Sequence, residues 1–187
     1  MWSFSIRVCV LIPFLLLFQV TAFAGTKVSI ETSMGSINLE LADDKAPQTV
    51  ANFLKYVDSG FYSQTVFHRV INNFMIQGGG FTEDLSKKRT RPSIKLEAPG
   101  KTGLSNTRGT VAMARLPTLH SATSQFFINV SDNRNLDSHG GGYAVFGRVT
   151  SGMDVVDRIK AVPTTIKSGM RDVPKNHVII KRIYRIE

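Results

Sequence analysis

Apolar and polar residues alternate at two different periods after residue 25. In Gly35–Ala42 the apolar Ile37, Leu39 and Leu41 alternate with polar residues, which is typical of a strand that buries one face. Thr26–Glu31 precedes this segment across a short turn, so the two segments predict a β-hairpin.

The period then lengthens to that of a helix. Between Pro47 and Gly60 apolar residues recur at i, i+3, i+4 and i+7, namely Val50, Phe53, Leu54 and Val57. Proline suits the first turn of a helix and glycine suits its end. A second, shorter helix is predicted over Met153–Val162, because its apolar residues share one face and Pro163 follows.

Short β-rich runs make up most of the remaining chain. They are separated by glycine and asparagine and comprise Thr65–Ile71, Phe74–Gln77, Thr110–Ala114, Gln125–Val130, Tyr143–Val149 and His177–Ile186. No linker, repeat or change of composition divides them, so we expect a single domain over residues 25–187. Closely spaced strands with two helices predict a mainly β fold, either a barrel or a sandwich.

Residues 1–24 have a different composition from the rest of the chain. A single Arg7 precedes an apolar run from Val8 to Val20, and the segment ends in Ala22-Phe23-Ala24. Small residues at this spacing are typical of a signal-peptidase site, so we expect a signal peptide that is cleaved after Ala24, leaving no stable membrane anchor. The apolar run is short for a membrane span. An uncleaved anchor is the alternative.

Composition excludes several kinds of chemistry. The only cysteine, Cys9, lies in the predicted signal peptide, so the mature chain has no disulfide, cysteine nucleophile or thiolate metal site. The four histidines lack metal-ligand spacing, and neither Gly-Gly-Gly run continues as a phosphate-binding loop. We therefore expect no metal and no cofactor. Without disulfides the exported chain is best suited to a bacterial periplasm.

The formal net charge of +9 raises the question of a nucleic-acid partner. The densest basic run is Lys87–Arg91, and no aromatic residues are interleaved with it to stack on bases. No nucleic-acid-binding motif is present. The run therefore indicates a solvated loop, and we expect no nucleic-acid partner.

One segment, Val66–Gly79, places a charge among large apolar residues. Met75 and Gln77 share one face of a strand, and Gln125 and Phe127 do so in a later strand. With Phe74 and Arg69 they could form a surface that combines an apolar floor, amide edges and one cation. Alternatively, the apolar residues belong to the core.

Five motifs, in this order and spacing, resemble those of the cyclophilins, the cyclosporin-binding peptidyl-prolyl cis–trans isomerases. They are VFHRVINNFMIQGG, TVAMAR, SATSQFFINV, NLD and YAVFGRV. The resemblance covers nearly all of the chain after the predicted signal and is greatest to bacterial periplasmic members of the rotamase A type. It implies an eight-stranded antiparallel closed β-barrel capped by two α-helices, and an isomerase acting on proline-containing polypeptides.

The resemblance also assigns roles to residues. Arg69 matches the catalytic arginine of the family. The other matches are substrate-binding positions. They are His68 in the groove, Phe74, Met75 and Phe127 in the proline pocket with Leu136 beside it, Gln77 and Gln125 on the substrate backbone, Ala114 and Arg115 along the peptide-binding edge, and Tyr143. We expect a turn through Asn72-Asn73 to return the chain so that Gln77 contacts Arg69.

Three positions depart from many eukaryotic members. Asn135 replaces a tryptophan that contacts cyclosporin, Tyr143 replaces a histidine and Arg115 replaces an asparagine. The resemblance therefore implies weak cyclosporin binding but retained isomerase activity. Two alternatives remain, a chaperone that holds proline-containing segments without turnover and a binder of anionic surfaces. No coiled coil or apolar stripe predicts an oligomer, so we expect a monomer.

Overall fold

The computed structural model describes residues 25–187, so the predicted signal peptide lies outside the described residues. Two α-helices cover apolar parts of the sheet, α1 (Pro47–Asp58) and α3 (Met153–Lys160). A short helix α2 (Pro99–Thr102) and two 3-10 turns, η1 (Arg134–Asp137) and η2 (His139–Gly141), occupy connections. The strands are β1 (Lys27–Thr32), β2 (Gly35–Leu41), β3 (Thr65–Val66), β4 (Arg69–Ile71), β5 (Met75–Gly78), β6 (Thr110–Met113), β7 (Phe126–Asn129), β8 (Val145–Ser151), β9 (Thr164–Lys167), β10 (Met170–Pro174) and β11 (Ile179–Ile186).

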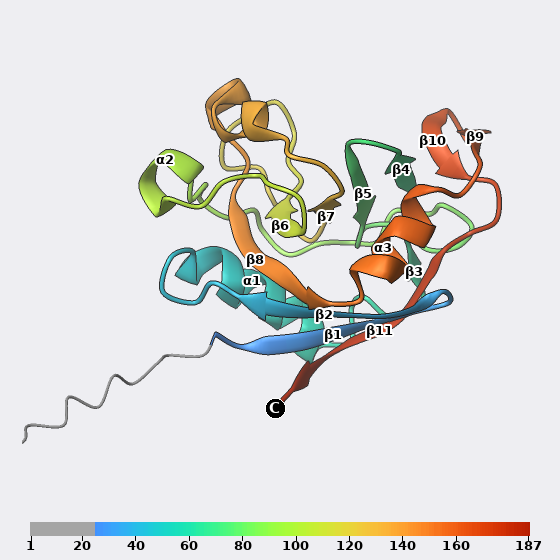
Figure 1. Ribbon diagram of the computed structural model, residues 1–187, viewed down its shortest axis with the longest axis horizontal. Helices are drawn as coiled ribbons and strands as arrows, with labels where there is room; N and C mark the ends of the chain where they lie inside the picture. Colours follow the sequence, from blue (N-terminus) through green and yellow to red (C-terminus); the bar gives the residue numbers. More distant parts are fainter. Residues whose placement is uncertain (1–24) are drawn as a thin grey trace, which may run out of the picture.

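Nine of these strands form one antiparallel sheet in the order β3-β11-β1-β2-β8-β6-β7-β5-β4 (Figure 1). The two strands at the ends of this order, β3 and β4, are separated in the chain only by Phe67 and His68. The sheet therefore curls until its ends meet along Thr65–Ile71. The prediction of a mainly β antiparallel fold with two covering helices is confirmed. The strand count differs from eight because Thr65–Ile71, expected as one strand, is divided in two.

A second, two-stranded sheet of β9 and β10 was not predicted. Its strands are short, β9 is largely exposed, and β10 ends in the adjacent buried residues Val173 and Pro174, so neither strand shows a clear alternation of apolar and polar residues. β10 contacts β4, and Figure 1 shows the hairpin beside β4 at one end of the molecule.

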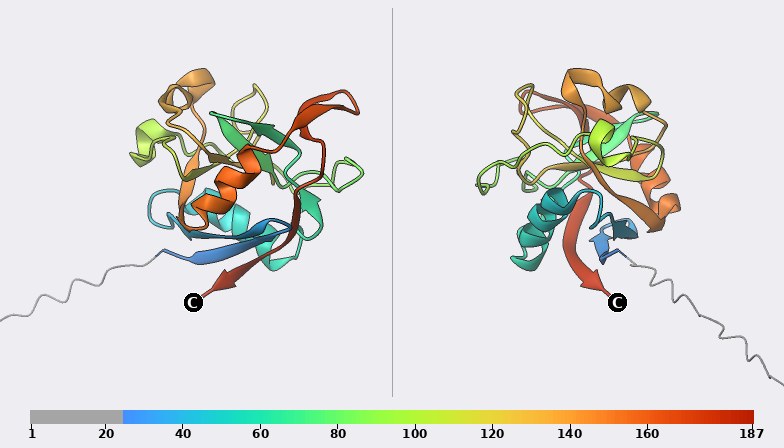
Figure 2. Two further views of the ribbon diagram at one scale, coloured as in Figure 1. Left: turned by 45° about the vertical axis from the view of Figure 1, so that its right-hand side comes forward. Right: turned by 90° about the vertical axis from the view of Figure 1, so that its left-hand side faces the viewer.

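The two predicted helices form close to their expected bounds. They lie on opposite sides of the molecule in the right-hand view of Figure 2. The first turn of α1 receives its cap from a distant residue: the backbone N–H groups of Gln48 and Thr49 donate to the Glu97 carboxylate at 3.1 and 2.8 Å. A carboxylate here satisfies free N–H groups and complements the helix dipole, which fixes the helix against the loop that carries Glu97.

The buried apolar side chains form a main core, a smaller cluster on the other face of the sheet, and a third small group of Val66, Leu85 and Val173. Adjacent residues of β7 show the division, because Phe126 enters the main core while Phe127 enters the smaller cluster. In the main core Phe126 packs edge-on against Phe53 of α1, with ring centroids 5.6 Å apart. The smaller cluster also contains Met75 and Leu136. Three residues that the sequence predicted as site residues therefore pack together in it.

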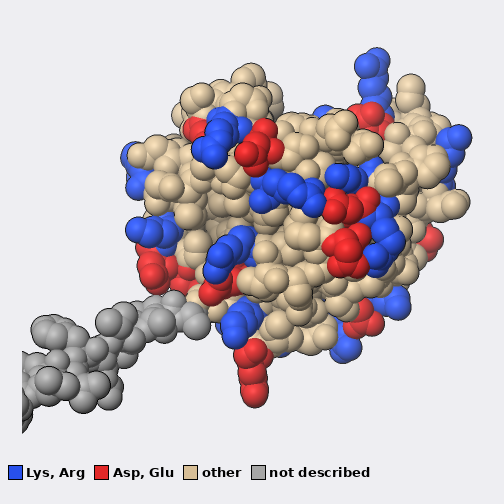
Figure 3. Space-filling view, viewed as in Figure 1, with Lys and Arg blue, Asp and Glu red and all other residues tan. Residues whose placement is uncertain are grey.

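Charged side chains of both signs are intermixed on the face shown in Figure 3. Several lie in ion pairs, such as Arg148 with Glu40 and Arg108 with Asp157. Within residues 25–187, no helix has the length and apolar character needed to cross a membrane.

Candidate active site

A row of side chains crosses three neighbouring strands on the face that carries the smaller cluster. Arg69 of β4 lies opposite Gln77 of β5, and Gln77 lies opposite Phe127 of β7. Directly opposed residues of antiparallel strands project from the same face, so a cation, an amide and an aromatic ring become neighbours. The turn at Asn72-Asn73 makes this possible, since Asn73 adopts a left-handed φ of 66°.

The row opens onto a cavity of about 370 Å³. Large apolar side chains and two arginines line it. The lining residues are Arg69, Phe74, Met75, Gln77, Ala114, Arg115, Phe127, Asn135, Leu136, His139 and Tyr143. Met75 and Phe127 are almost fully buried and yet form walls of this cavity, so they pack the smaller cluster and shape the site together.

Arg69 is held from within the site. Its Nη1 donates to Oε1 of Gln77 at 3.4 Å, and Nε2 of Gln77 donates to Oε1 of Gln125 at 2.9 Å. The geometry confirms the expected contact between Gln77 and Arg69. Because Gln77 uses its oxygen for Arg69 and its nitrogen for Gln125, the amide orientation is fixed by both partners.

Arg115 has a different environment from Arg69, although both line the cavity. Its guanidinium donates to backbone carbonyls of two loops, including those of Gly142 at 3.0 Å and Leu116 at 3.0 Å. It also lies 4.6 Å from the centre of the Tyr143 ring, which in turn packs edge-on against Phe127. Arg115 therefore joins the loops that carry Leu116 and Tyr143, and its donors are occupied by the protein itself.

His68 lies apart from the cavity. Its side chain is 5% exposed and packs against Phe81, with ring centroids 4.6 Å apart. Burial lowers the pKa of His68 from 6.5 to about 4, and the charge of the neighbouring Arg69 acts in the same direction. The imidazole is therefore neutral at pH 7. All the other predicted site residues except Gln125 line the cavity, and Gln125 contacts the cavity residue Gln77 through the hydrogen bond described above.

A smaller cavity of about 220 Å³ adjoins the first and contains Gln125. It shares Gln77, Ala114 and Arg115 with the larger cavity, and Lys87 also lines it. The backbone N–H of Ala114 donates to the Gln125 carbonyl at 3.0 Å, which fixes the wall between the two spaces. The basic Lys87–Arg91 loop therefore begins beside the site.

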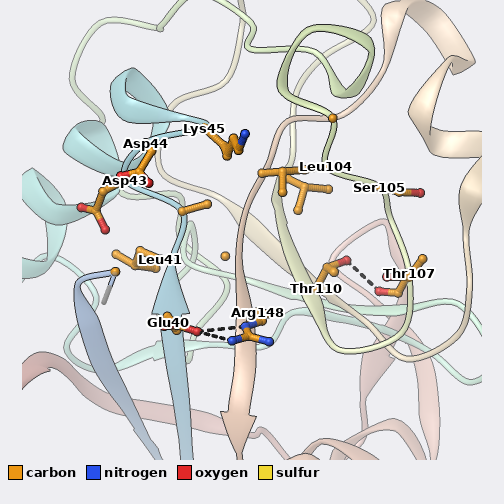
Figure 4. A pocket seen from close by; sticks show the side chains of 15 residues that line it. Glu40, Leu41, Asp43, Asp44, Lys45, Leu104, Ser105, Thr107, Thr110 and Arg148 are labelled. Carbon is orange, nitrogen blue, oxygen red and sulfur yellow. Dashed lines mark hydrogen bonds and ion pairs between the residues drawn. The ribbon is translucent and has the colours of Figure 1, made fainter. Parts of the chain in front are cut away.

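A third space of about 380 Å³ lies near the start of the described chain (Figure 4). Its floor includes Leu41, Leu104 and Val145, and none of the predicted site residues lines it. Arg148 at its edge is paired with Glu40 at 2.6 Å. Val145 belongs to the same apolar cluster as Met75 and Phe127, and Leu104 packs against that cluster, but the two cavities have no lining residue in common.

Two cavity residues were not predicted as functional. His139 was interpreted as one of four unremarkable histidines, and Asn135 only as a departure from a family pattern. Both lie on the 3-10 turns that close one side of the cavity. Their proximity to Leu136 in the chain was the available signal. Within residues 25–187, no group of three or more histidine, cysteine or acidic side chains is placed to hold a metal ion.

Buried amides fix the cavity wall behind Phe74. Nδ2 of Asn133 donates to the Phe74 carbonyl and to Oδ1 of Asn129, both at 2.7 Å. Nδ2 of Asn129 donates to Oδ1 of Asn106 at 3.2 Å, and Asn106 contacts Asp137. The network ties Phe74 to the η1 turn that carries Leu136, so both sides of the cavity share one support.

We expect Asn133→Ala to lower the free energy of unfolding by about 1–3 kcal/mol. It leaves Oδ1 of Asn129 without a donor and leaves the Phe74 carbonyl with only the backbone N–H of Val130, at 3.1 Å. Urea unfolding followed by fluorescence measures the loss. Asn135→Ala is the matched control, since Asn135 is exposed two residues further on. Equal stability of the two variants would show that the network does not support the fold.

The structure is thus a curled antiparallel sheet that carries an apolar cavity with Arg69 in its lining. Residues 27–185 match the family model described as cyclophilin type peptidyl-prolyl cis-trans isomerase/CLD. The chain therefore belongs to the cyclophilin-type peptidyl-prolyl cis–trans isomerases.

Individual relatives agree with this assignment. The chain is 55% identical over 162 residues to peptidyl-prolyl cis-trans isomerase B of Escherichia coli, covering 83% of this chain and 97% of that protein. It is 52% identical to peptidyl-prolyl cis-trans isomerase A of Dickeya dadantii, covering 86% and 84%. A cyclophilin-type isomerase of Cryptosporidium parvum, crystallised in the presence of the dipeptide Ala-Pro, has a TM-score of 0.72 at 27% identity and covers 86% and 99%.

Proposed function

We propose that this isomerase accelerates rotation about X–Pro bonds during the folding of exported proteins, and that Arg69 stabilises the twisted prolyl amide. The observation that carries the proposal is the position of the Arg69 guanidinium at the edge of an apolar cavity, held there by Gln77. The Ala-Pro dipeptide used with the Cryptosporidium relative supports a proline-containing ligand.

Catalysis of rotation about an X–Pro bond requires only a modest lowering of the activation barrier. The barrier of about 18–20 kcal/mol arises from amide resonance, and uncatalysed rotation takes tens to hundreds of seconds. Lowering this barrier by about 4–7 kcal/mol accelerates rotation roughly 10³- to 10⁵-fold. No bond is broken, so the reaction requires neither a nucleophile nor a metal.

Arg69 suits the twisted state better than either planar isomer. When the bond twists, resonance is lost and the prolyl nitrogen gains a lone pair that accepts a hydrogen bond. A guanidinium directed at this nitrogen lowers the energy of the twisted state alone, which is the requirement for catalysis. Arginine remains charged and has several donors, so Gln77 can hold Nη1 while another donor faces the substrate.

The cavity walls supply the second requirement. Phe74, Met75, Phe127 and Leu136 enclose a space in which a proline ring would exclude water. Hydrogen bonds in such a site are stronger than in bulk water, so a single donor from Arg69 contributes more. The ring also anchors one side of the bond, and rotation of the preceding segment then changes the isomer.

The proposed clients require that the enzyme itself be exported, which we infer from residues 1–24. Cleavage after Ala24 would leave Gly25 as the first residue of the mature chain. We expect N-terminal sequencing of the protein from a periplasmic fraction to begin at Gly25, and Ala24→Lys, which removes a small residue from the cleavage site, to accumulate the precursor. Recovery of the uncleaved chain in the cytoplasmic fraction would contradict the export proposal but not the isomerase activity.

Turnover separates catalysis from simple holding of proline segments. A protease-coupled assay with an Ala-Pro peptide measures the rate of cis-to-trans conversion at enzyme concentrations far below that of the peptide. A catalyst increases the rate in proportion to its concentration, whereas a holding protein cannot affect substrate in such excess. Refolding of a protein limited by a slow prolyl step should accelerate in parallel.

A further inference from the structure

The β9–β10 hairpin places a carboxylate beside Arg69. Oδ2 of Asp172 lies 3.8 Å from Nε of Arg69, and each side chain is about 40% exposed. Gln77 approaches the same guanidinium from its own strand and contacts Nη1. Arg69 therefore has one partner at Nε and another at Nη1, and within residues 25–187 its Nη2 makes no hydrogen bond or ion pair.

The backbone at Asp172 departs from regular strand geometry. Asp172 adopts a left-handed φ of 61°, which few residue types tolerate, and it lies where the pairing of β10 with β9 shifts register. The next residue, Val173, is fully buried in a small cluster with Val66 and Leu85. Since Val66 belongs to the same segment as Arg69, the hairpin is anchored close to the site.

Stability does not explain the pair. An ion pair between half-exposed side chains contributes little to folding, and this contact is longer than the 2.7 Å pair between Arg182 and Glu31 on β11 and β1. A left-handed non-glycine residue, by contrast, carries a conformational cost. Such costs are often found at functional sites, but left-handed residues also occur here away from the site, as at Leu85, so it is the contact with Arg69 that gives Asp172 a functional role.

We propose that Asp172 is a positioning residue that, together with Gln77, orients the Arg69 guanidinium so that Nη2 faces the prolyl nitrogen. The inference rests on the proposed role of Arg69. The carboxylate on Nε and the amide on Nη1 fix the plane of the guanidinium, which leaves its remaining edge for the substrate. Asp172 itself does not contact the reacting atoms. It acts by reducing the number of orientations that Arg69 samples before rotation begins.

Two substitutions separate the charge of Asp172 from its backbone. Asp172→Asn removes the charge but keeps a residue that tolerates the left-handed conformation, and Asp172→Gly removes the side chain without strain. We expect each to lower kcat by about three- to tenfold with KM changed less than about twofold, as measured by saturation with an Ala-Pro peptide. Glu31→Gln is the matched control, since it neutralises the carboxylate of a pair elsewhere and should leave kcat unchanged.

A double-mutant cycle tests whether Asp172 acts through Arg69. In an Arg69→Lys background, which has no Nε–H donor in the same place, Asp172→Asn should change kcat less than about 1.5-fold. An unchanged or higher kcat in Asp172→Asn, a KM effect alone, or an equal loss in the Arg69→Lys background would overturn the inference. Full activity of Arg69→Lys and Arg69→Ala would instead overturn the proposed role of Arg69, so the two failures are distinguishable.

Discussion

Replacing Arg69 by alanine is expected to lower kcat/KM for prolyl isomerisation by about 10²- to 10³-fold, which is the usual cost of removing one preorganised donor from a transition state. Arg69→Lys should fall between alanine and the wild type. It keeps the charge but loses the fork that lets Gln77 hold one donor while another faces the substrate. A protease-coupled assay with an Ala-Pro peptide measures both variants.

The fold should survive this change. Arg69 is about 40% exposed, and its contacts with Gln77 and Asp172 are long, so their loss costs less than about 1 kcal/mol. Thermal unfolding checks this expectation. Arg182→Ala is the matched control because it removes an exposed arginine from an ion pair on β1 and β11. Turnover of Arg69→Ala within about threefold of the wild type, with Arg182→Ala equally active, would contradict the mechanism.

Local patterns in the sequence predict the parts of this site that are close together in the chain. Arg69 and Gln77 face each other because a turn at Asn72-Asn73 reverses one short segment, and the alternation of side chains then fixes which residues share a face. The same alternation places Met75 with Gln77. The period of the apolar residues likewise predicts α1 and α3, because each helix buries one stripe.

Contacts between segments that are distant in the chain could not be predicted from these local patterns. Gln77 meets Gln125 only because β5 pairs with β7 in one particular register, and a strand does not encode its partner in its own pattern. Glu97 caps α1 from a loop for the same reason. The resemblance to a family supplied the expectation that Gln125 belongs to the site.

Asp172 illustrates a second limit. Its strand β10 is short and its pairing with β9 is irregular, so the pattern of apolar residues does not predict it. A left-handed aspartate also has no distinctive pattern in the sequence. His68 shows the opposite case. Its place in the motif suggested a groove residue, whereas its side chain is buried against Phe81. His68 directly precedes Arg69 in the chain, and neighbouring residues of an extended segment project to opposite sides.

The burial of His68 makes the stability of the protein depend on pH. In the unfolded chain the histidine binds a proton with its ordinary pKa of 6.5, while in the folded protein its pKa is about 4. Between these values the unfolded state holds more protons, so the free energy of unfolding falls as pH falls through 6.5 toward 4. The full effect is about 3 kcal/mol, of which about 2 kcal/mol should be lost between pH 7 and pH 5.

Urea unfolding at pH 7, 6 and 5 measures this loss, because carboxyl groups titrate mainly below that range. His68→Gln should flatten the profile, since it keeps a polar side chain at the site but cannot bind a proton. His120→Gln is the control, because it removes an exposed imidazole instead. If His68→Gln loses stability between pH 7 and pH 5 as steeply as His120→Gln does, the buried histidine is not the titrating group.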